Sequence, residues 1–539
     1  MRRPSRGHLL LWFSTLILLL AGAWGAGAHP TLDSGGGMAL PAHPATTPTE
    51  AVVESDGAPG APGGEVSPGT LESPGALESP GAEGATGQEA SAWTSGSLDT
   101  PLWDRLRSLL GLLLIGVLAW AMSTNRRRIP WRVVGWGLTL QLGFAVFILK
   151  TPLGAGLFRW LNDVVVALLG FTVEGARFIF GDLVFNTVPV GVGEPGMMPI
   201  QETTDLVANT GAFFAFNVLP TIIFFSSLMS LLYHLGVMQI LVKGVAWVMQ
   251  RTMGTSGAET LSAAGNIFVG QTEAPLLVKP FVRKMTNSEL MAVMTGGFAT
   301  VAGGVLAAFV GMLVAYFPDI AGHLIAASVM SAPAALVIAK IMVPETETPE
   351  TATRLGVELE QRYVNSIEAA SGGAAEGLQL ALNVGAMLLA FIALIAMVNA
   401  GIGWTGGLVG LPDLSLEGIL GWGLAPLAYL MGVSWADAPT VGSLMGLKTV
   451  VNEFVAYLQL SAILAGAEGG APGLEPRSII IATYALSGFA NFASIAIQIG
   501  GIGGIAPERR GDLSRLGLRA MIAGSLAAFM TATIAGMLL

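Results

Sequence analysis

Long apolar segments recur from about residue 105 to the end of the chain, and they constrain the fold more than any other feature. A segment of about 20 apolar residues crosses a bilayer only as a helix, because lipid offers no partners for backbone N–H and C=O groups. The chain is 53% hydrophobic and only 12% charged. We therefore predict an all-α polytopic membrane protein with about eight transmembrane helices. The expected spans are about 105–123, 133–149, 213–233, 288–316, 321–343, 377–399, 478–503 and 517–538.

The first hundred residues differ in composition from the rest. Residues 1–28 begin with three arginines, continue with the apolar stretch Leu9–Leu20 and end in small residues, as a secretory signal peptide does. An uncleaved N-terminal anchor is the alternative. Residues 29–101 are rich in Gly, Pro, Ala and Glu and contain no Lys or Arg. Such a segment buries too little apolar surface to fold, so we predict a disordered periplasmic linker.

The distribution of arginine gives an orientation in the lipid bilayer. Arg126, Arg127, Arg128 and Arg132 separate the first two expected spans, and the positive-inside rule places such a loop in the cytoplasm. A second arginine-rich loop, 509–519, precedes the last span. These loops, together with the signal segment, predict a bacterial inner-membrane protein whose linker and C-terminus are both periplasmic.

The segment Asn266–Pro280 is polar within an otherwise apolar region. It carries Gln271, Thr272 and Glu273 between a glycine and a proline. An unpaired carboxylate is costly in a membrane and marks a functional site by default. We expect one half-helix to end before these residues and a second to begin with Thr272 as its N-cap, giving a re-entrant hairpin over about 256–284. The alternative is a kinked structural helix with Glu273 salt-bridged.

The same arrangement occurs a second time. A candidate hairpin over about 437–466 holds Asn452 and Glu453. Each hairpin is followed by a span that glycines and polar residues interrupt, near Thr300 in the first case and near Gly488 in the second. The first hairpin should open inward and the second outward. Two re-entrant hairpins and two broken helices in an inverted repeat are typical of secondary transporters, with the site at the repeat interface.

The connecting segments are less regular. We expect one or two interfacial helices and a Gly/Pro-rich loop in 151–212, an interfacial helix at 234–248, and a cytoplasmic connector at 344–376. His323 lies near a span end and is expected at the interface. Lys448 is expected to anchor a hairpin end rather than contact substrate.

The polar residues of the two repeats have the chemistry of a binding site. Glu273 and Glu453 can accept hydrogen bonds from hydroxyl groups, and Gln271 offers both a donor and an acceptor. Phe489 can pack on a flat ring. These residues by themselves fit a sugar, an amide or a nucleoside.

Three motifs, Gly270–Pro275, Gly446–Tyr457 and Tyr484–Ser494, resemble the signatures of the concentrative nucleoside transporter family and occur in the same order. The resemblance covers about 102–539. It implies a sodium-driven symporter that imports nucleosides. It also implies a homotrimer in which a transport domain moves, elevator-like, against a scaffold. The implied scaffold is about 102–235 and 377–433, and the implied transport domain about 236–343 and 434–539.

Position by position, the resemblance implies roles for twelve residues. The residues matching base-binding positions are Gln271, Thr272 and Glu273, with Val305 beside the base. Those matching ribose-binding positions are Glu453, Asn491 and Ser494, and Phe489 packs on the nucleoside. Those matching the sodium site are Asn266, Val269, Thr300 and Val301, some through backbone carbonyls. Thr300 stands where a Ser is familiar and Val301 where an Ile is; Ala274 replaces a frequent Ser, which leaves the base preference open.

Three other functions compete with this interpretation. Protons could replace sodium if Glu273 or Glu453 carried them. An intramembrane enzyme is disfavoured because the membrane region contains no His-Glu-x-x-His or Gly-x-Ser-x-Gly motif. A passive channel is a third possibility, and counterflow would distinguish it. The chain has no cysteine, which excludes thiol chemistry, and no basic, aromatic-rich patch suggests a nucleic acid partner.

Overall fold

The computed structural model describes residues 100–185, 187–192, 202–209, 214–352, 363–408, 410–468 and 473–539. All of them belong to one compact unit, Glu89–Leu539. The expected signal peptide and almost all of the expected linker lie outside these residues, as does 353–362 of the expected connector.

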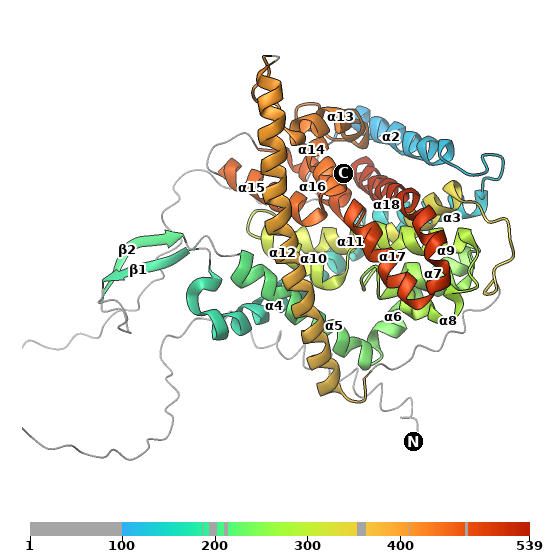
Figure 1. The fold of residues 1–539 in the computed structure, drawn as a ribbon, viewed down its shortest axis with the longest axis horizontal. Coiled ribbons are helices and arrows are strands. Elements are labelled where there is room, and N and C mark those ends of the chain that lie inside the picture. The colour runs from blue at the N-terminus through green and yellow to red at the C-terminus, as the bar shows by residue number, and fades with distance from the viewer. Residues whose placement is uncertain are drawn as a thin grey trace, which may run out of the picture. The chain divides into compact units, whose positions relative to one another are not determined.

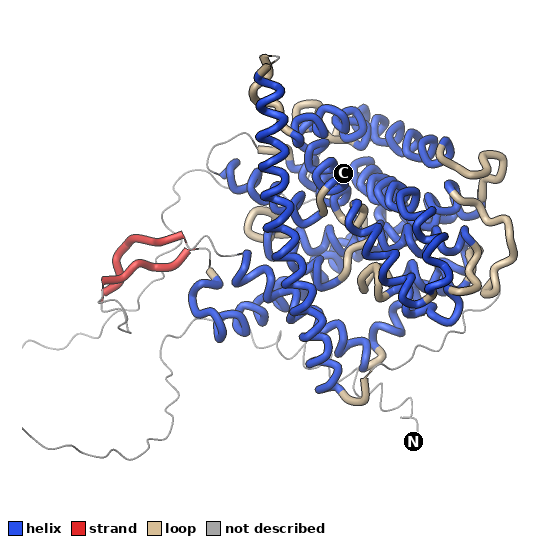
Figure 2. The backbone as a smooth tube through the Cα atoms, in the orientation of Figure 1, coloured by secondary structure: helices blue, strands red, loops and turns tan. Residues whose placement is uncertain are grey.

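The described chain is almost entirely helical, which confirms the predicted fold class (Figures 1 and 2). Seven described segments are long and apolar enough to cross a membrane. They are Trp131–Lys150 (α3), Pro152–Val184 (α4 and the 3-10 turn η1), Phe214–His234 (the π-turn η2 and α5), Asn287–Leu313 (α9 and α10), Ile320–Met342 (α11), Ser366–Gly407 (α12) and Pro507–Leu538 (the 3-10 turn η4 and α18).

The remaining helices are shorter or more polar. They are Leu102–Ala121 (α2), Val237–Met253 (α6), Gly257–Gly265 (α7), Ala274–Val278 (the 3-10 turn η3), Lys279–Val282 (α8), Leu416–Met431 (α13), Ala438–Val450 (α14), Glu453–Glu468 (α15), Pro476–Leu486 (α16) and Phe492–Ile505 (α17). Two expected spans thus fall outside the seven segments. The helix at 105–123 exists as α2 but carries charges in its first turns, and 478–503 is divided between α16 and α17.

A small antiparallel sheet is an addition that the sequence interpretation does not contain. Its strands are Thr187–Val192 (β1) and Glu202–Asn209 (β2), with Thr187 opposite Asn209. The pairing register shifts between Pro189 and Gly191. The sequence interpretation expects only a Gly/Pro-rich loop here, but the β-branched Val and Thr residues between those glycines and prolines favour extended backbone.

Two long helices also correct the expected boundaries. Residues Pro152–Phe180 form one helix, α4, within the expected number of one or two, but its 29 residues make it long and apolar enough to cross a membrane rather than only to lie at the interface. Thr151 caps it by accepting a hydrogen bond from Gly154 N at 3.0 Å. Helix α12 has 42 residues and absorbs the end of the connector, the sixth span and part of the outer segment. At about 1.5 Å per residue it is about 63 Å long, so it must cross the bilayer steeply tilted or project from it. It is the long orange helix that runs across Figure 1.

Burial separates two classes of span. The most apolar windows of α9–α10 and α11 are each 89% buried, and that of α18 is 83% buried. Those of α4 and α12 are only 11% and 17% buried. A helix that is apolar on all sides requires either a protein or a lipid environment. The spans α9–α10, α11 and α18 therefore form the interior of the protein. Helices α4 and α12 present apolar surface to the bilayer or to a partner.

The first candidate hairpin folds back between two linked ends. At its start, Ser256 N donates to Glu259 Oε1 at 2.8 Å, forming a capping box. At its end, Thr286 and Glu289 form a second capping box, with both bonds at 3.0 Å. Ser256 Oγ donates to Glu289 Oε1 at 2.6 Å and joins the two ends.

A buried cation strengthens this junction. Lys340 of α11 is 4% exposed, and its Nζ lies 2.6 Å from Glu259 Oε2 and 2.9 Å from Ser288 Oγ. Charged groups are buried at acceptable cost only when they are paired. The network therefore fixes the base of the hairpin to α9 and α11, and its tip projects away from that base.

The tip of this hairpin differs from the expected geometry in one respect. The second half begins with the 3-10 turn η3, whose N-cap residue is Glu273, not Thr272. Glu273 Oε2 accepts a hydrogen bond from Gly270 N at 3.2 Å. This bond closes a turn around Gln271 and Thr272 and leaves Thr272 inside the turn.

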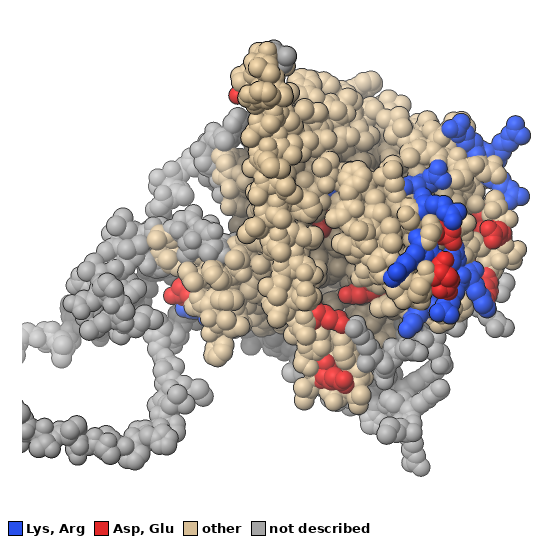
Figure 3. Space-filling view, in the orientation of Figure 1, with Lys and Arg blue, Asp and Glu red and all other residues tan. Residues whose placement is uncertain are grey.

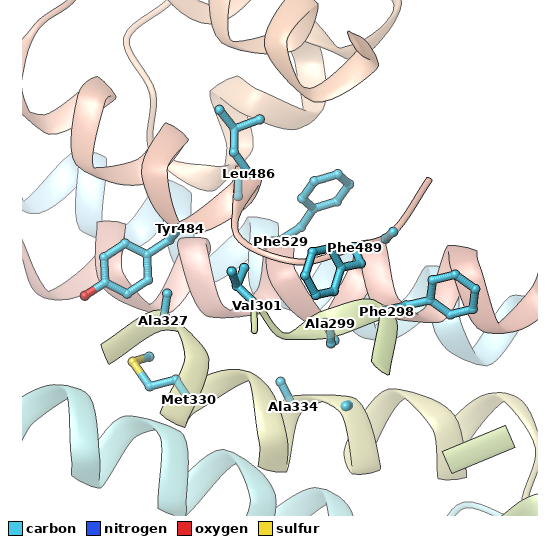
Figure 4. Packing of buried hydrophobic residues seen from close by; sticks show 14 of the residues in the cluster. Phe298, Ala299, Val301, Ala327, Met330, Ala334, Tyr484, Leu486, Phe489 and Phe529 are labelled. Atoms are coloured by element: carbon cyan, nitrogen blue, oxygen red, sulfur yellow. The ribbon is translucent and has the colours of Figure 1, made fainter. Parts of the chain in front are cut away.

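Both predicted breaks in the following spans are present, and they cross each other. One separates α9 from α10 at Thr300–Ala302, and the other separates α16 from α17 at Ser487–Asn491. Gly488 has φ +124°, and a Cβ there would lie 2.8 Å from the backbone oxygens of Phe298 and Ala299. Figure 4 shows the unwound backbone at Ala299–Val301 beside Leu486–Phe489.

His323 is a correction to the sequence interpretation, because it is fully buried rather than interfacial. Its ring centroid lies 4.9 Å from that of Phe158 and 5.1 Å from that of Phe317. Its Nδ1 is 3.3 Å from Tyr484 Oη. The cause is helix α4, which covers this end of α11: Asn162 Oδ1 accepts from Gly322 N at 3.3 Å.

Basic residues from distant loops gather on one side of the molecule. Arg132 donates to the backbone oxygens of Arg251 and Thr252, at 3.2 and 3.1 Å. Arg509 donates to Met285 O at 2.6 Å, which joins the loop before α18 to the end of the first hairpin. In Figure 3 most Lys and Arg side chains on the visible face lie at its right-hand edge. Loops that share one membrane surface would be arranged in this way.

Candidate binding cavity

A cavity of about 970 Å³ lies between the hairpins and broken helices on one side and α5 and α12 on the other. Its wall includes all eight residues that we assigned to substrate binding, which the sequence distributes over more than 200 positions. These are Gln271, Thr272 and Glu273 from the first hairpin, Val305 from α10, Glu453 from the second hairpin, Phe489 from the second break, and Asn491 and Ser494 from the start of α17.

One pair of polar side chains joins the second hairpin to the second broken helix. Glu453, the first residue of α15, is 4% exposed, and its Oε2 accepts a hydrogen bond from Asn491 Nδ2 at 2.9 Å. Asn491 is also the N-cap of α17, where its Oδ1 accepts from Ser494 N at 2.8 Å. Asn452 caps α15 in the same way by accepting from Val455 N at 2.9 Å. The two capping bonds therefore fix the helix starts so that the Glu453 carboxylate and the Asn491 amide lie next to each other.

A second pair joins the two repeats. Gln271 Nε2 lies 3.1 Å from Ser494 Oγ, although the residues are 223 positions apart. The Ser494 hydroxyl is thus used between two elements of the chain. Behind the pair, Gln498 Nε2 donates to Gln271 Oε1 at 3.1 Å.

The other wall residues differ in exposure. Glu273 is exposed, whereas Val305 and Phe489 are 2% and 8% exposed. The carboxylate therefore borders open space in the cavity, which removes much of the cost of placing a charge there. Phe489 also belongs to the packed interior in Figure 4, so its ring both lines the cavity and packs in the core.

The four residues matched to the sodium site lie directly behind this wall. Asn266, Val269, Thr300 and Val301 are all less than 8% exposed, and only Val269 reaches the cavity. Asn266 is the C-cap residue of α7 and Thr300 is that of α9, so each lies at a helix C-terminus, which carries partial negative charge. Gly296 of α9 is near both residues: an added Cβ there would lie 3.1 Å from Asn266 Nδ2, and its carbonyl accepts from Thr300 Oγ1.

Asn266 gives this region its strongest chemical signal. It is fully buried, yet neither its Oδ1 nor its Nδ2 has a hydrogen-bond partner among the described residues. Thr300 Oγ1 donates to Gly296 O at 2.9 Å and keeps its lone pairs for another group. A buried amide that lacks partners is costly. Oxygen atoms beside two helix C-termini suit a small hard cation.

Some residues of the site were not found from the sequence. Ser226 and Ser230 of α5, and Gln379 and Asn383 of α12, face the cavity opposite the hairpins. Each pair has a four-residue spacing on an apolar helix, which is a signal that could have been used. Gln498 has the same spacing from Ser494 on the apolar helix α17, and this signal was also not used.

Lys448 has an unexpected place. It is fully buried at the end of α14, and its Nζ donates to Ala485 O at 2.9 Å. It anchors the hairpin as expected, but it does so beside the break of α16 rather than at the hairpin's outer end. A cation at a helix C-terminus is stabilised by the helix dipole.

Family models cover most of the membrane region. Residues 110–183 match the model described as Na+ dependent nucleoside transporter N-terminus, and 323–536 match the corresponding C-terminus model. Residues 215–316, which include the first hairpin, match a model described as nucleoside recognition.

Curated proteins resemble the chain over about the same region. Sodium/nucleoside cotransporter 1 of Rattus norvegicus is 43% identical over 444 residues, which are 81% of this chain and 64% of that protein. Solute carrier family 28 member 3 of Eptatretus stoutii is 44% identical over 79% of this chain and 60% of its own length. The chain thus spans less than two thirds of these animal relatives. A protein of Haemophilus influenzae named only as an uncharacterized transporter is 45% identical over 80% of this chain and 97% of its own length.

Solved structures share the fold. CNTnw in an inward-facing substrate-bound state matches with a TM-score of 0.71 and 43% identity, over 80% of this chain and 97% of that chain. A CNTnw variant in an outward-facing state matches with a TM-score of 0.73 and 43% identity, over 81% of this chain and 98% of that chain. These neighbours are transporters rather than enzymes.

Proposed function

This chain belongs to the concentrative nucleoside transporter family, and on that premise we propose that it is a symporter that imports nucleosides across the bacterial inner membrane, driven by the sodium gradient. The observation that carries the proposal is the cavity wall. Eight polar, apolar and aromatic residues from both hairpins and both broken helices surround one space of about 970 Å³. A nucleoside needs hydroxyl acceptors, a base-edge partner and a flat apolar contact, and this wall supplies all three.

Within the proposal, the two ends of the nucleoside have different partners. Glu453 and Asn491 bind the ribose hydroxyls, and Ser494 lies at the junction between ribose and base. Gln271, Thr272 and Glu273 face the base edge, and Val305 and Phe489 cover its faces.

Sodium is favoured over protons as the coupling ion by Asn266 and Thr300. An ion coordinated by the Asn266 carbonyl oxygen and the Thr300 hydroxyl would satisfy a buried amide that otherwise has no partner among the described residues. It would also lie at two helix C-termini. In this arrangement the ion is a transported substrate that stabilises the hairpin beside the nucleoside.

The cavity's position supports transport by alternating access. It separates the hairpin-bearing elements from α5 and α12, which are parts of the proposed scaffold. Helices α2 and α3, by contrast, lie on the other side. Arg477 pairs with Asp104 of α2 at 3.5 Å, Thr124 N of the loop between α2 and α3 donates to Met342 O at 2.9 Å, and α3 packs against α11. We therefore place α2 and α3 with the moving part, although the resemblance implied that residues from about 102 to 235 belong to the scaffold. In this proposal the moving part undergoes an elevator-like motion in each protomer of a homotrimer.

Uptake of labelled uridine and adenosine into proteoliposomes tests the function. A sodium gradient imposed alone should drive accumulation above the external concentration, and a proton gradient imposed alone should not. Uptake driven only by protons would remove the sodium assignment, and the absence of counterflow would favour a channel.

A further inference from the structure

Gln498 of α17 lies just behind the cavity wall and is fully buried. Its Nε2 is 3.1 Å from Met294 O and 3.1 Å from Gln271 Oε1. We propose that Gln498 is a positioning residue that fixes which end of the Gln271 amide faces the cavity, and so selects the nucleobase edge. The inference rests on the proposed function.

The direction of both amides follows from donor chemistry. A backbone carbonyl only accepts, so the Gln498 atom beside Met294 O must be the amide nitrogen. The same nitrogen faces Gln271, which must therefore present its oxygen. The Gln271 nitrogen is then turned toward Ser494 Oγ, 3.1 Å away. The Met294 carbonyl of α9 thus determines which end of each amide donates and which accepts, from Gln498 through Gln271 to Ser494.

The surrounding backbone leaves these two amides little freedom. A Cβ atom at Gly297 would lie 2.8 Å from Gln498 Nε2 and 2.9 Å from Gln271 Cβ. The α9 backbone therefore packs directly on the pair. Reversing the Gln271 amide would place two NH₂ groups against each other and leave a buried donor unsatisfied.

This polarity has a consequence for recognition. The Gln271 NH₂ group has two protons, and Ser494 takes one of them. The other remains for an acceptor on the base, which is a ring nitrogen or a carbonyl oxygen. If the Gln271 amide could rotate freely, it could present its oxygen instead and accept a hydrogen bond from a donor group on the base equally well. Gln498 therefore makes the cavity select an acceptor at that position.

The test compares ligands that differ in one base acceptor. Binding of adenosine, 1-deazaadenosine, 3-deazaadenosine, 7-deazaadenosine and 3′-deoxyadenosine is measured for the wild type, Gln498→Met and Gln498→Asn. In the wild type, one deaza analogue should bind about tenfold more weakly than adenosine, as expected for a lost hydrogen bond. In both variants that penalty should fall below about threefold, while the 3′-deoxy penalty is unchanged. Gln498→Met removes the amide, and Gln498→Asn keeps one that is too short to reach both partners.

Gln141→Met is the matched control. Gln141 is also fully buried, and its Nε2 donates to Gly137 O at 3.2 Å on α3, away from the cavity. The Gln141→Met substitution should leave the affinity of each analogue relative to adenosine unchanged. The role of Gln498 would be overturned if the wild type bound all three deaza analogues as tightly as adenosine. It would also be overturned if the Gln498 variants lost affinity equally for all five ligands. Failure of the wild type to bind any nucleoside would instead contradict the proposed function, and this inference with it.

Discussion

Pairs of polar side chains, rather than single residues, form the centre of the cavity wall. Glu453 with Asn491 and Gln271 with Ser494 are each held by a direct hydrogen bond between separate elements. Removing one member leaves the other buried and unsatisfied, which costs about 1–3 kcal/mol. Substitutions within a pair should therefore be strongly non-additive, and the ligand must be varied together with the protein to separate binding from structure.

Glu453→Gln should weaken ribonucleoside binding by roughly ten- to a hundredfold, because hydrogen bonds to a charged acceptor contribute about 1.5–3 kcal/mol each. The change keeps the shape of the side chain and removes the charge that accepts ribose hydroxyl protons. Binding of uridine and 3′-deoxyuridine to both proteins forms a double-mutant cycle. The variant should lose much less affinity for 3′-deoxyuridine; if the two losses simply add, Glu453 and the 3′-hydroxyl do not interact.

Thr300→Ala should raise the sodium concentration for half-maximal uptake by about three- to tenfold. The hydroxyl that is lost offers its lone pairs beside Asn266. Thr295→Ala is a close control, because Thr295 is also buried in α9 and also donates to the carbonyl four residues earlier, Met291 O, at 2.7 Å. Nucleoside uptake by both variants is measured as a function of sodium concentration. If the two variants need the same sodium concentration for half-maximal uptake, Thr300 does not belong to the ion site.

At the scale of elements, the crossing of two unwound segments is the feature on which the site depends. The break after α9 carries Thr300, and the break after α16 carries Phe489 and leads to Asn491. Gly488 has a positive φ and lies against the Ala299 oxygen at the crossing. Glycine is required there twice over, by its backbone angle and by the lack of space for a Cβ.

Gly488→Ala should destabilise the protein by about 1–3 kcal/mol, the usual cost of a strained backbone conformation, and should reduce uptake as well. Gly500→Ala is the control, since Gly500 lies in α17 with nothing within 4 Å of an added Cβ. Thermal unfolding of both variants in detergent compares them. A midpoint for Gly488→Ala equal to that of the control would mean that the crossing can relax without cost.

At the scale of the whole molecule, the gathered arginine loops favour one orientation. Arg132 at the start of α3 donates to the backbone at the end of α6, and Arg509 before α18 donates to the backbone after the first candidate hairpin. Positively charged loops remain on the cytoplasmic side. If the arginine-rich side is cytoplasmic, we expect the C-terminus on the periplasmic side, after the single span α18.

The absence of cysteine makes this topology directly testable. Single cysteines are introduced at two exposed loop positions, Arg127→Cys and Asp413→Cys, and intact cells are treated with a membrane-impermeant maleimide. Asp413→Cys should be labelled in intact cells, and Arg127→Cys only after permeabilisation. The reverse pattern would invert the protein in the membrane.

The sequence by itself determined the helical fold class and the breaks, and through the family resemblance it indicated eight of the residues that line the cavity. Apolar length forces helices in lipid, and local signals end them: the Ser256 and Thr286 capping boxes and the polar breaks near Thr300 and Gly488 are all legible in the order of the amino acids. Local signals also failed in places. They did not indicate the 3-10 start after Glu273, the full length of α4, the 42-residue α12 or the strands β1 and β2.

Only the tertiary structure decided how distant residues meet. Gln498 and Gln271 are 227 positions apart, and nothing near either residue specifies their bond. The neighbours of His323 in sequence end a span and so predict an interfacial position, yet α4 buries this residue completely. Lys448 likewise finds its partner, Ala485 O, on another helix. Capping and hydrophobic periodicity depend on residues that are close in sequence. Buried polar groups, by contrast, form hydrogen bonds with groups that the tertiary fold places beside them. These partners could therefore not be predicted from the sequence.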